Sequence, residues 1–408
     1  MSIASYAKLE PHSREVISAH VISDFGTPTQ NWLGTRLLSL TRYRPLVLTN
    51  QNSCRSEQQL LVRSYSEASN WRKGRLALPG LGPRFEWKHR LSRFFWDQLA
   101  RSESALLHCH FGTVSVEHSA LRRAVKERLG MRTVTSFYGF DIPWLLQSEP
   151  AVARELFSSE DAFVLEGPFM ASRLEAAGCP KEKLYVNPLG IDVNRFRPGG
   201  NSTGTEDVRV LAVGRLVEKK GFGDAIRATH QARSRGAPLH LNIVGDGPQR
   251  SYLESTIDAL QCDGFVKLLG NVSYDALLDL YHSSDILLQP STTAPDGDTE
   301  GGAPLSIVEG MAAGLPVLAT RHADIPNVVR HGETGILVGE GCVEELASAL
   351  VLLCANEERR ASLGGAGRKR ALSDFNAKIQ GQRLEQIYDA ITTGPPSKNE
   401  SLKVNCAA

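Results

Sequence analysis

Residues 296–320, DGDTEGGAPLSIVEGMAAGLPVLAT, predict a turn, a short helix and a buried strand in succession. Asp296 and Gly297 favour the turn. Residues 306–313 have a helical pattern that ends before Gly314, a residue suited to the left-handed position after a helix. The apolar residues 317–319 then fit a strand inside a parallel sheet. This succession indicates an α/β fold.

The start of the expected helix has the features of an anion site. Pro304 suits the first helical turn, where a missing N–H costs nothing. Gly301 and Gly302 allow the backbone to come close to a ligand. The free N–H groups and partial positive charge of a helix N-terminus favour an anion there. The carboxylates of Glu300 and Glu309 are near enough to contact the same ligand.

The alternation of strand, loop and helix continues on both sides of this segment. Strands are expected at residues 16–23, 46–49, 105–110, 132–136, 163–165, 184–186, 209–213, 240–244, 266–269, 286–289 and 335–338. Helices are expected at residues 32–40, 88–101, 116–129, 168–177, 249–260, 274–282, 346–355 and 357–372. This pattern predicts parallel sheets covered by helices. Residues 198–205, PGGNSTGT, have the composition of a linker, so we place a domain boundary there.

Bulk properties exclude several classes of protein. The chain has 408 residues, enough for two or three domains. A net charge of +1 gives no electrostatic argument for nucleic acid binding. The seven cysteines are scattered without a C-x-x-C pair, which indicates neither a zinc site nor a disulfide framework. The N-terminus lacks the apolar core of a signal peptide, and no stretch is apolar enough for a membrane span. We therefore expect a cytoplasmic protein.

Residues 309–317, EGMAAGLPV, resemble the donor-site signature of the retaining group 1 glycosyltransferases, also called family 4. In the family, two glutamates bracket a segment that contains glycine and proline, and the second glutamate opens this run; here eight residues separate Glu300 from Glu309, where seven are usual. Gly190-Ile191-Asp192 resembles the family's entry to its interdomain linker. The resemblance covers most of residues 100–390. It implies a GT-B fold, in which two Rossmann-like, doubly wound parallel-sheet domains face a cleft.

The resemblance also implies a division of the chain. Residues 15–197 would form an acceptor-side domain, and residues 206–374 a domain that binds the nucleotide-sugar donor. A helix over residues 375–392 would cross back to the first domain. The composition of residues 393–408, apart from the resemblance, predicts a disordered tail.

In the second domain, the resemblance assigns the donor site. Arg215 and Lys220 would stabilise the departing diphosphate, since arginine offers a fork of donors and lysine a mobile charge. Glu300 would orient the sugar, and Glu309 would hold the ribose. The expected nucleotide contacts are Gly214, Gly245, Gly301, Gly302, Ala303, Pro304, Leu305 and Glu309. The family generally needs no metal, so no metal and no other cofactor are expected.

In the first domain, the strand that ends in His110-Phe111-Gly112 resembles the family's His-x-His-Phe-Gly motif. We count His110 among the catalytic candidates; a structural histidine bonded to a loop carbonyl is the alternative. Because strand side chains alternate between faces, we expect His108 and His110 to face opposite sides, which argues against a two-histidine metal site.

Three further residues are candidates for sugar or acceptor contacts. Tyr138 stands where the family has histidine; tyrosine donates a hydrogen bond but does not titrate near neutral pH. Asp141 matches the family directly and could equally cap the following segment. Gly26 lies in the first glycine loop, which faces the acceptor in GT-B enzymes; a simple surface turn is the alternative.

The function expected from the resemblance is transfer of a sugar from a UDP- or GDP-sugar to a saccharide or lipid-linked saccharide, in surface polysaccharide biosynthesis. The Glu-Gly-Gly-Ala-Pro and His-x-His-Phe-Gly segments are most similar to exopolysaccharide and colanic-acid enzymes. Arg72, Lys73 and Arg75 form a basic patch beside Trp71, which could contact an anionic lipid at the inner membrane face or be a solvated charged surface. The alternatives are a non-catalytic sugar-nucleotide sensor or scaffold and a GT-B epimerase. A nicotinamide oxidoreductase is disfavoured because no G-x-G-x-x-G follows the first strand.

Overall fold

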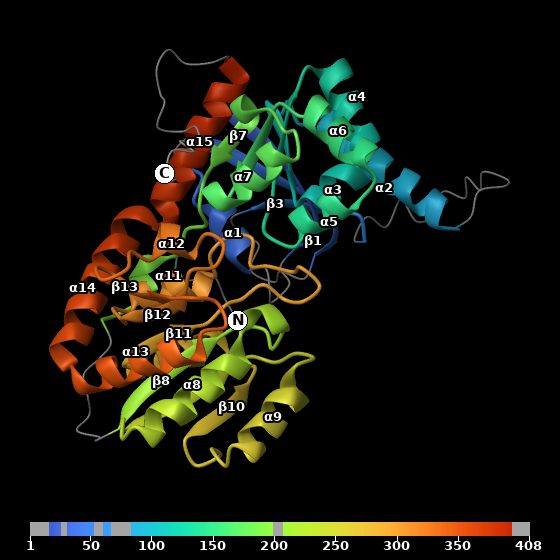
Figure 1. Ribbon diagram of the computed structural model, residues 1–408. Helices are drawn as coiled ribbons and strands as arrows, with labels where there is room; N and C mark the ends of the chain where they lie inside the picture. The colour runs from blue at the N-terminus through green and yellow to red at the C-terminus, as the bar shows by residue number, and fades with distance from the viewer. Residues whose placement is uncertain (1–15, 26–30, 53–59, 67–82, 199–206, 394–408) are drawn as a thin grey trace. The chain divides into compact units, whose positions relative to one another are not determined.

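The computed structural model describes residues 16–25, 31–52, 60–66, 83–198 and 207–393 (Figure 1). Gly26, the basic patch at residues 71–75, most of the expected linker and the expected tail lie outside these residues. The chain divides into unit 1, residues 1–190 with 377–408, and unit 2, residues 191–376. The first domain was expected to extend to residue 197. Ile191, Val193 and Phe196 instead pack in the core of unit 2, which places the division earlier.

Unit 1 is built on a parallel sheet whose described strands run in the order β3-β2-β1-β4-β5-β6-β7. Its strands are β1 (Val16–Phe25), β2 (Tyr43–Asn52), β3 (Leu61–Ser64), β4 (Leu106–His110), β5 (Arg132–Ser136), β6 (Ala162–Leu165) and β7 (Leu184–Val186). Its helices are α1 (Asn31–Leu38), α2 (Pro83–Leu99), α3 (Gly112–Glu117), α4 (Ser119–Leu129), α5 (Asp141–Gln147), α6 (Pro150–Ser159), α7 (Pro168–Ala176) and α15 (Ala377–Thr393).

Helices cover both faces of this sheet (Figure 1). The side chains of Leu107 and Cys109 point into a core formed with α2 and α4. Leu106 points the other way, into a core that α15 closes with Leu384 and Tyr388. The C-terminal helix is therefore a structural part of unit 1, although about 190 residues of unit 2 precede it.

Unit 2 is built on a second parallel sheet, whose described strands run β10-β9-β8-β11-β12-β13. Its strands are β8 (Val208–Val213), β9 (Leu239–Val244), β10 (Val266–Gly270), β11 (Ile286–Gln289), β12 (Val317–Thr320) and β13 (Gly335–Val338). Its helices are α8 (Phe222–Ser234), α9 (Arg250–Ala259), α10 (Tyr274–Ser283), α11 (Leu305–Ala312), α12 (Ile325–Val328), α13 (Val343–Ala355) and α14 (Glu357–Asp374).

Each sheet has a point at which the order of its strands reverses. In unit 1 the reversal lies between β1 and β4, and in unit 2 between β8 and β11. Open α/β sheets bind ligands beyond the carboxyl ends of the strands at such a point. The loops that follow β8 and β11 carry Arg215, Lys220 and Glu300, and the strands β1 and β4 carry His20, His108 and His110.

The structure differs from the expected elements in two respects. The single helix predicted over residues 116–129 is two helices, α3 and α4, separated at His118. The prediction also placed no elements at β3, α5, α6, α8 and α12. Helix α8 begins after Gly221, whose left-handed φ of 66° turns the chain out of the preceding loop. An added Cβ at Gly221 would lie 1.9 Å from the carbonyl oxygen of Pro290, so glycine is required there.

No helix in the described part of the chain combines the length and apolar character needed to cross a membrane.

Candidate active site

A buried ion pair joins the two loops at the reversal point of unit 2. Lys220 Nζ lies 2.9 Å from the carboxylate of Glu300, and both side chains are almost fully buried. Ser291, just after β11, donates a hydrogen bond of 2.7 Å to the other side of this carboxylate. Burial alone would raise the pKa of Glu300, but the Lys220 charge and the Ser291 hydroxyl together lower it. Glu300 is therefore a carboxylate at neutral pH, with its charge balanced by Lys220.

The loop that carries Glu300 is held by a separate set of contacts. Lys219 Nζ donates to Asp298 Oδ1 at 3.0 Å and to the Thr299 carbonyl at 2.8 Å. The backbone N–H of Glu300 donates to His322 Nε2, and His322 Nδ1 donates to Glu340. Lys219, the sequence neighbour of Lys220, therefore positions the loop. It is buried, whereas Arg215 is exposed at the end of β8.

Glu309 lies on α11, facing two tyrosines of α10. Tyr281 donates to Glu309 Oε2 at 2.8 Å, and Tyr274 lies 3.4 Å from Oε1. The guanidinium of Arg195 stacks over the Tyr274 ring at 4.4 Å. Burial raises the pKa of Glu309 to about 7 despite the tyrosine hydroxyls, which lower it. Glu309 can thus change its charge near neutral pH.

The first residues of α11 are tied to the same reversal point. Ser306 Oγ donates to Gln289 Oε1 at 2.9 Å, and Gln289 Nε2 donates to Ser291 Oγ at 3.1 Å. This chain of hydrogen bonds links the start of α11 to the Glu300 carboxylate. The loop into α11 consists of Gly301, which has a φ of 75°, Gly302, Ala303 and Pro304. Helix α11 begins at Leu305.

Two glycines let the loops after β8 and β9 touch. Gly245 has a φ of 132°, and a Cβ there would lie 1.9 Å from the Gly214 carbonyl oxygen. A Cβ on Gly214 would lie 3.1 Å from Lys220 Cε. Gly214, Gly245 and Lys220, three of the predicted donor-site residues, therefore lie close together on neighbouring loops at one edge of the sheet.

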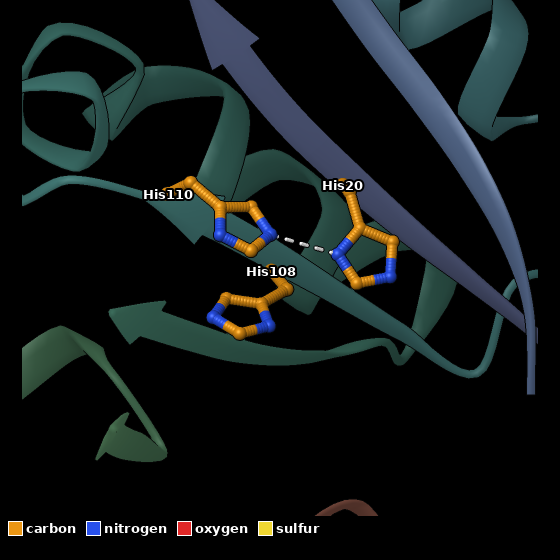
Figure 2. Close-up of side chains that lie close together, drawn as sticks. All are labelled: His20, His108 and His110. Atoms are coloured by element: carbon orange, nitrogen blue, oxygen red, sulfur yellow. Dashed lines mark hydrogen bonds between the residues drawn. The ribbon is translucent and has the colours of Figure 1, made fainter. Parts of the chain in front are cut away.

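In unit 1, the prediction that His108 and His110 face opposite sides is wrong. Alternation separates sequence neighbours, so residues two apart share a face. The two rings stack with centroids 4.3 Å apart, and His20 pairs with His108 in the strand register. One ring nitrogen from each of these three buried histidines lies within 4.8 Å of the other two (Figure 2).

These three histidines have the residue types and spacing of a metal site, but their surroundings favour hydrogen bonding. Every ring nitrogen has a hydrogen-bond partner, and the set of three contains no carboxylate to balance a cation. Burial, with the neighbouring histidines and the Arg36 charge, lowers the pKa of His108 and His110 well below the usual value. Burial and Arg36 lower the pKa of His20 to about 3. The three imidazoles are therefore neutral.

The other candidates of unit 1 lie around this cluster. His110 is fully buried, and its Nδ1 is 2.6 Å from the hydroxyl of Tyr138, which is half-buried. Asp141 is fully buried and accepts hydrogen bonds from the backbone N–H groups of Gly112 and Tyr138. Burial raises the pKa of Asp141 to about 6, although the hydrogen bonds from these N–H groups lower it. Asp141 thus holds the loops after β4 and β5 together.

Sequence reasoning missed several residues of these sites, among them His20, Tyr281, Ser291 and His322. Ser291 and His322 follow the carboxyl ends of β11 and β12, so their position in the alternating pattern could have indicated them. His20 and Tyr281 lie inside elements, and only the strand register and the helix packing bring them to the other residues.

Comparison with known proteins establishes the family. Residues 197–370 match the family "Glycosyl transferases group 1". The chain is 30% identical over 285 residues to the putative colanic acid biosynthesis glycosyltransferase WcaL of Escherichia coli K12, covering 69% of this chain and 70% of WcaL. The chain belongs to the group 1 glycosyltransferases. It is also 31% identical over 284 residues to the amylovoran biosynthesis glycosyltransferase AmsK of Erwinia amylovora, covering 69% of each chain.

The fold of this glycosyltransferase matches solved structures over nearly its whole length. Anabaena HepE, solved in complex with UDP, aligns with a TM-score of 0.71 at 16% identity, over 92% of this chain and all of HepE. The predictions of a group 1 glycosyltransferase and of a GT-B fold built from two Rossmann-like units are confirmed.

Proposed function

We propose that this glycosyltransferase takes its sugar from a UDP- or GDP-sugar bound by unit 2 and transfers it with retention of anomeric configuration. The observation that carries this proposal is the Lys220–Glu300 pair, which lies beside Gly214 at the reversal point of the sheet. A lysine, a glycine loop and a helix N-terminus gathered at one edge of a sheet suit a diphosphate. The UDP in the HepE structure supports the same class of ligand.

Lys220 and Arg215 act on the leaving group. As the bond from the anomeric carbon to the diphosphate breaks, negative charge grows on the departing oxygen. A cation held in advance stabilises that charge without reorganisation. The Glu300 carboxylate and the packing of the glycine loop hold Lys220 in place. Arg215, exposed on the same loop, reaches the diphosphate from the solvent side.

Glu300 and Glu309 orient the two ends of the donor. Glu300 is ionised, so its carboxylate accepts hydrogen bonds from sugar hydroxyls near the anomeric carbon. Glu309 accepts hydrogen bonds from the ribose hydroxyls when it is ionised, and two tyrosines hold its carboxylate. The acceptor hydroxyl attacks from the face that the diphosphate leaves, and its proton passes to the leaving phosphate oxygen.

The transfer is expected to proceed without a metal ion. Asp296-Gly297-Asp298 resembles a metal-binding Asp-x-Asp pattern in letters alone. Asp298 is paired with Lys219, and Asp296 accepts a hydrogen bond from the Asp298 backbone N–H. Both carboxylates are therefore used to shape the loop.

The acceptor is a saccharide or a lipid-linked saccharide of a surface polysaccharide, bound by unit 1. The names of WcaL and AmsK, both in exopolysaccharide biosynthesis, support this assignment. A lipid-linked acceptor places the enzyme at the cytoplasmic face of a membrane, as a peripheral protein.

The experiment is to incubate the protein with a panel of UDP- and GDP-sugars and with lipid-linked saccharides, in EDTA, and to measure released UDP or GDP. We expect release that depends on acceptor and is lost in Lys220→Ala, and an α-linked product from an α-linked donor by NMR. A product of inverted configuration, or release that requires added metal, would contradict the mechanism. Nucleotide binding without turnover on any acceptor would favour the non-catalytic alternative.

A further inference from the structure

The histidine cluster of unit 1 forms one arm of a hydrogen-bonded chain that ends at Tyr138. Ser18 Oγ lies 2.9 Å from His20 Nε2, and His20 Nδ1 lies 2.9 Å from His110 Nε2 (Figure 2). His110 Nδ1 in turn lies 2.6 Å from the Tyr138 hydroxyl. These three bonds join four neutral groups, each of which carries one proton that it can donate. One of the four donor protons therefore has no acceptor within the arm, and it belongs to the group at one of the two ends.

The buried end decides where this extra proton lies. Ser18 is fully buried, and among the described residues its hydroxyl bonds to no side chain except His20. If Ser18 accepted the proton of His20, its own O–H would point into the core without a partner. A buried unpaired donor is costly. Ser18 therefore donates to His20, His20 donates through Nδ1 to His110, and His110 donates through Nδ1 to Tyr138.

A second arm reaches Tyr138 from the C-terminal helix. The hydroxyl of Tyr388, on α15, lies 2.6 Å from His108 Nδ1, and His108 Nε2 lies 2.7 Å from Ser136 Oγ. Tyr388 is fully buried, and among the described residues its hydroxyl bonds to no other side chain. The same reasoning makes Tyr388 the donor, so His108 donates through Nε2 to Ser136. Ser136 then keeps its own O–H to donate, and its hydroxyl lowers the pKa of the neighbouring Tyr138, as a donor to that phenol oxygen would.

We propose that these two arms converge on the Tyr138 oxygen and leave the Tyr138 O–H as an outward donor to a saccharide oxygen. His20, His108 and His110 are then positioning residues that act through Tyr138. This inference rests on the proposed function for the identity of the ligand. Tyr138 is half-buried and follows the carboxyl end of β5. Open α/β sheets bind their ligands beyond the carboxyl ends of the strands. A histidine at position 138 could change its charge near neutral pH. Tyr138 keeps its O–H proton over the whole neutral range, so the direction of its hydrogen bond stays the same.

The proton positions can be observed directly in the wild-type protein. Two-bond ¹H–¹⁵N correlation spectra of ¹⁵N-histidine-labelled protein distinguish the two neutral tautomers. We expect Nδ1–H on His20 and His110 and Nε2–H on His108, with assignments from His→Asn variants at each position. An Nε2–H tautomer of His110, or an imidazolium at pH 7, would overturn the proposal. Stoichiometric zinc bound through these rings in the purified protein would overturn it as well.

A double-mutant cycle tests the functional link. Tyr138→Phe removes one hydrogen bond to the ligand and should lower kcat/KM about 3- to 10-fold. Ser18→Ala removes the group that fixes the first arm and should lower kcat/KM by a smaller factor in the wild type, with no further loss in Tyr138→Phe. Equal losses in both backgrounds would mean that Ser18 is merely structural, and would contradict the proposal.

Matched controls separate this claim from the rest of the account. Ser115→Ala removes another buried hydroxyl of unit 1, which bonds to Thr135 outside the two arms. It should change the thermal midpoint without changing kcat/KM. His20→Asn keeps an amide N–H near the position of Nδ1 and should retain more activity than His20→Phe. The tautomers do not depend on unit 2, so failure of nucleotide binding would refute the proposed function and leave the tautomer result intact.

Discussion

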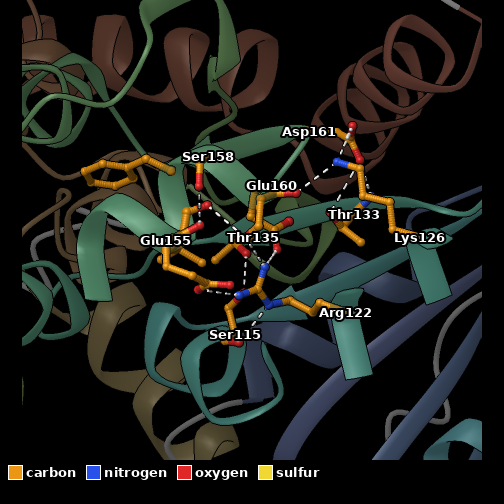
Figure 3. A network of polar contacts seen from close by, with 12 residues as sticks. Ser115, Arg122, Lys126, Thr133, Thr135, Glu155, Ser158, Glu160 and Asp161 are labelled. Atoms are coloured by element: carbon orange, nitrogen blue, oxygen red, sulfur yellow. Dashed lines mark hydrogen bonds and ion pairs between the residues drawn. The ribbon is translucent and has the colours of Figure 1, made fainter. Parts of the chain in front are cut away.

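Each unit contains a buried ion pair, and the two pairs lie at opposite edges of their parallel sheets. In unit 1, Arg122 on α4 pairs with Glu160, which comes just before the amino end of β6 (Figure 3). In unit 2, Lys220 pairs with Glu300 beyond the carboxyl ends of β8 and β11. Both pairs are almost fully buried. Burial of opposite charges therefore does not distinguish a structural pair from a functional one.

The surroundings of the two pairs make the distinction. The Arg122 guanidinium also donates to the Ser115 carbonyl, the Ser159 hydroxyl and Glu155, so protein groups use its donors on every side. The Lys220–Glu300 pair lies instead beyond the carboxyl ends of the strands at the reversal point of the sheet, which is where open α/β sheets bind their ligands. The position in the sheet, more than the pKa or the burial, indicates which pair binds a ligand.

The largest expected effect is on stability, at the pair of unit 1. Arg122→Ala leaves the fully buried Glu160 without its charge partner, and removal of one member of a buried pair costs about 3–5 kcal/mol. Urea unfolding of the variant should show this loss, with kcat per folded molecule unchanged. Arg123→Ala, an exposed neighbour on α4, is the control and should be near wild type.

A double variant sharpens this result. Arg122→Met with Glu160→Leu replaces both charges by apolar groups and should be more stable than Arg122→Ala, because no buried charge remains unpaired. A full loss of activity in folded Arg122→Ala would place the unit 1 pair in the catalytic machinery. The distinction between a structural pair in unit 1 and a ligand-binding pair in unit 2 would then be wrong.

The next effect is on turnover, at the pair of unit 2. Lys220→Ala removes the cation that faces the charge of the leaving group, and loss of one such group costs about 10²- to 10³-fold in kcat. Steady-state kinetics at saturating donor should show the loss in kcat, with the fold retained by circular dichroism. The exposed Lys267→Ala is the matched control. A raised KM with unchanged kcat would contradict this role, because it would show that Lys220 binds the ground state and the transition state equally.

A smaller effect concerns the pH dependence of nucleotide binding. The pKa of Glu309 is raised to about 7, so its carboxylate is half neutral there and accepts ribose hydroxyls better as pH rises. Calorimetry should show tighter UDP or GDP binding at pH 8 than at pH 6, and Glu309→Gln should bind weakly at both. A pH dependence that persists in Glu309→Gln would assign it to another group.

The same shift predicts the stability of the free protein. Because the folded pKa of Glu309 is raised above the ordinary value of 4.5, its contribution to stability is lost as pH rises from about 4.5 to about 7. Glu309→Gln without nucleotide should therefore gain stability over wild type at pH 8 and less at pH 5. Urea titrations at both pH values measure the difference, with the exposed Glu333→Gln as the control.

The smallest effect is expected at Ser291. Ser291→Ala removes the hydroxyl that bonds Glu300, which should raise the pKa of that carboxylate and cost about 1 kcal/mol of stability. Turnover should fall a few-fold, and the acidic limb of the pH–rate profile should move to higher pH, because Glu300 without the Ser291 hydroxyl takes up its proton more readily. A pH–rate profile identical to wild type would show that Ser291 does not tune Glu300.

Much of the fold could be predicted because its signals are local. The apolar strands at residues 184–186, 286–289 and 335–338 have the bounds expected from their sequence, since Gly, Pro and polar residues delimit them. The loop from Glu300 to Glu309 was recognisable for the same reason: one short segment contains its glycines, its proline and both carboxylates.

The rest depends on contacts between segments far apart in the chain. His20 meets His108 and His110 through the pairing of β1 with β4, and Tyr388 reaches His108 from the last helix. No local sequence pattern indicates which residues of two strands are paired. In addition, strand alternation was misapplied, so His108 and His110 were predicted on opposite faces although they share one. The break at His118 was missed because helix continues on both sides of it and no glycine or proline marks the position.

The most direct test of the central claim is nucleotide binding at the Lys220–Glu300–Glu309 site. Thermal unfolding would be followed with UDP, GDP, ADP and NAD in EDTA, in wild type and in Glu309→Gln. A nucleotide at 100 times its Kd stabilises the folded protein by about 2.7 kcal/mol. The account predicts a shift with UDP or GDP that is largely lost in Glu309→Gln. An equal shift in the variant, or a shift with NAD alone, would contradict it.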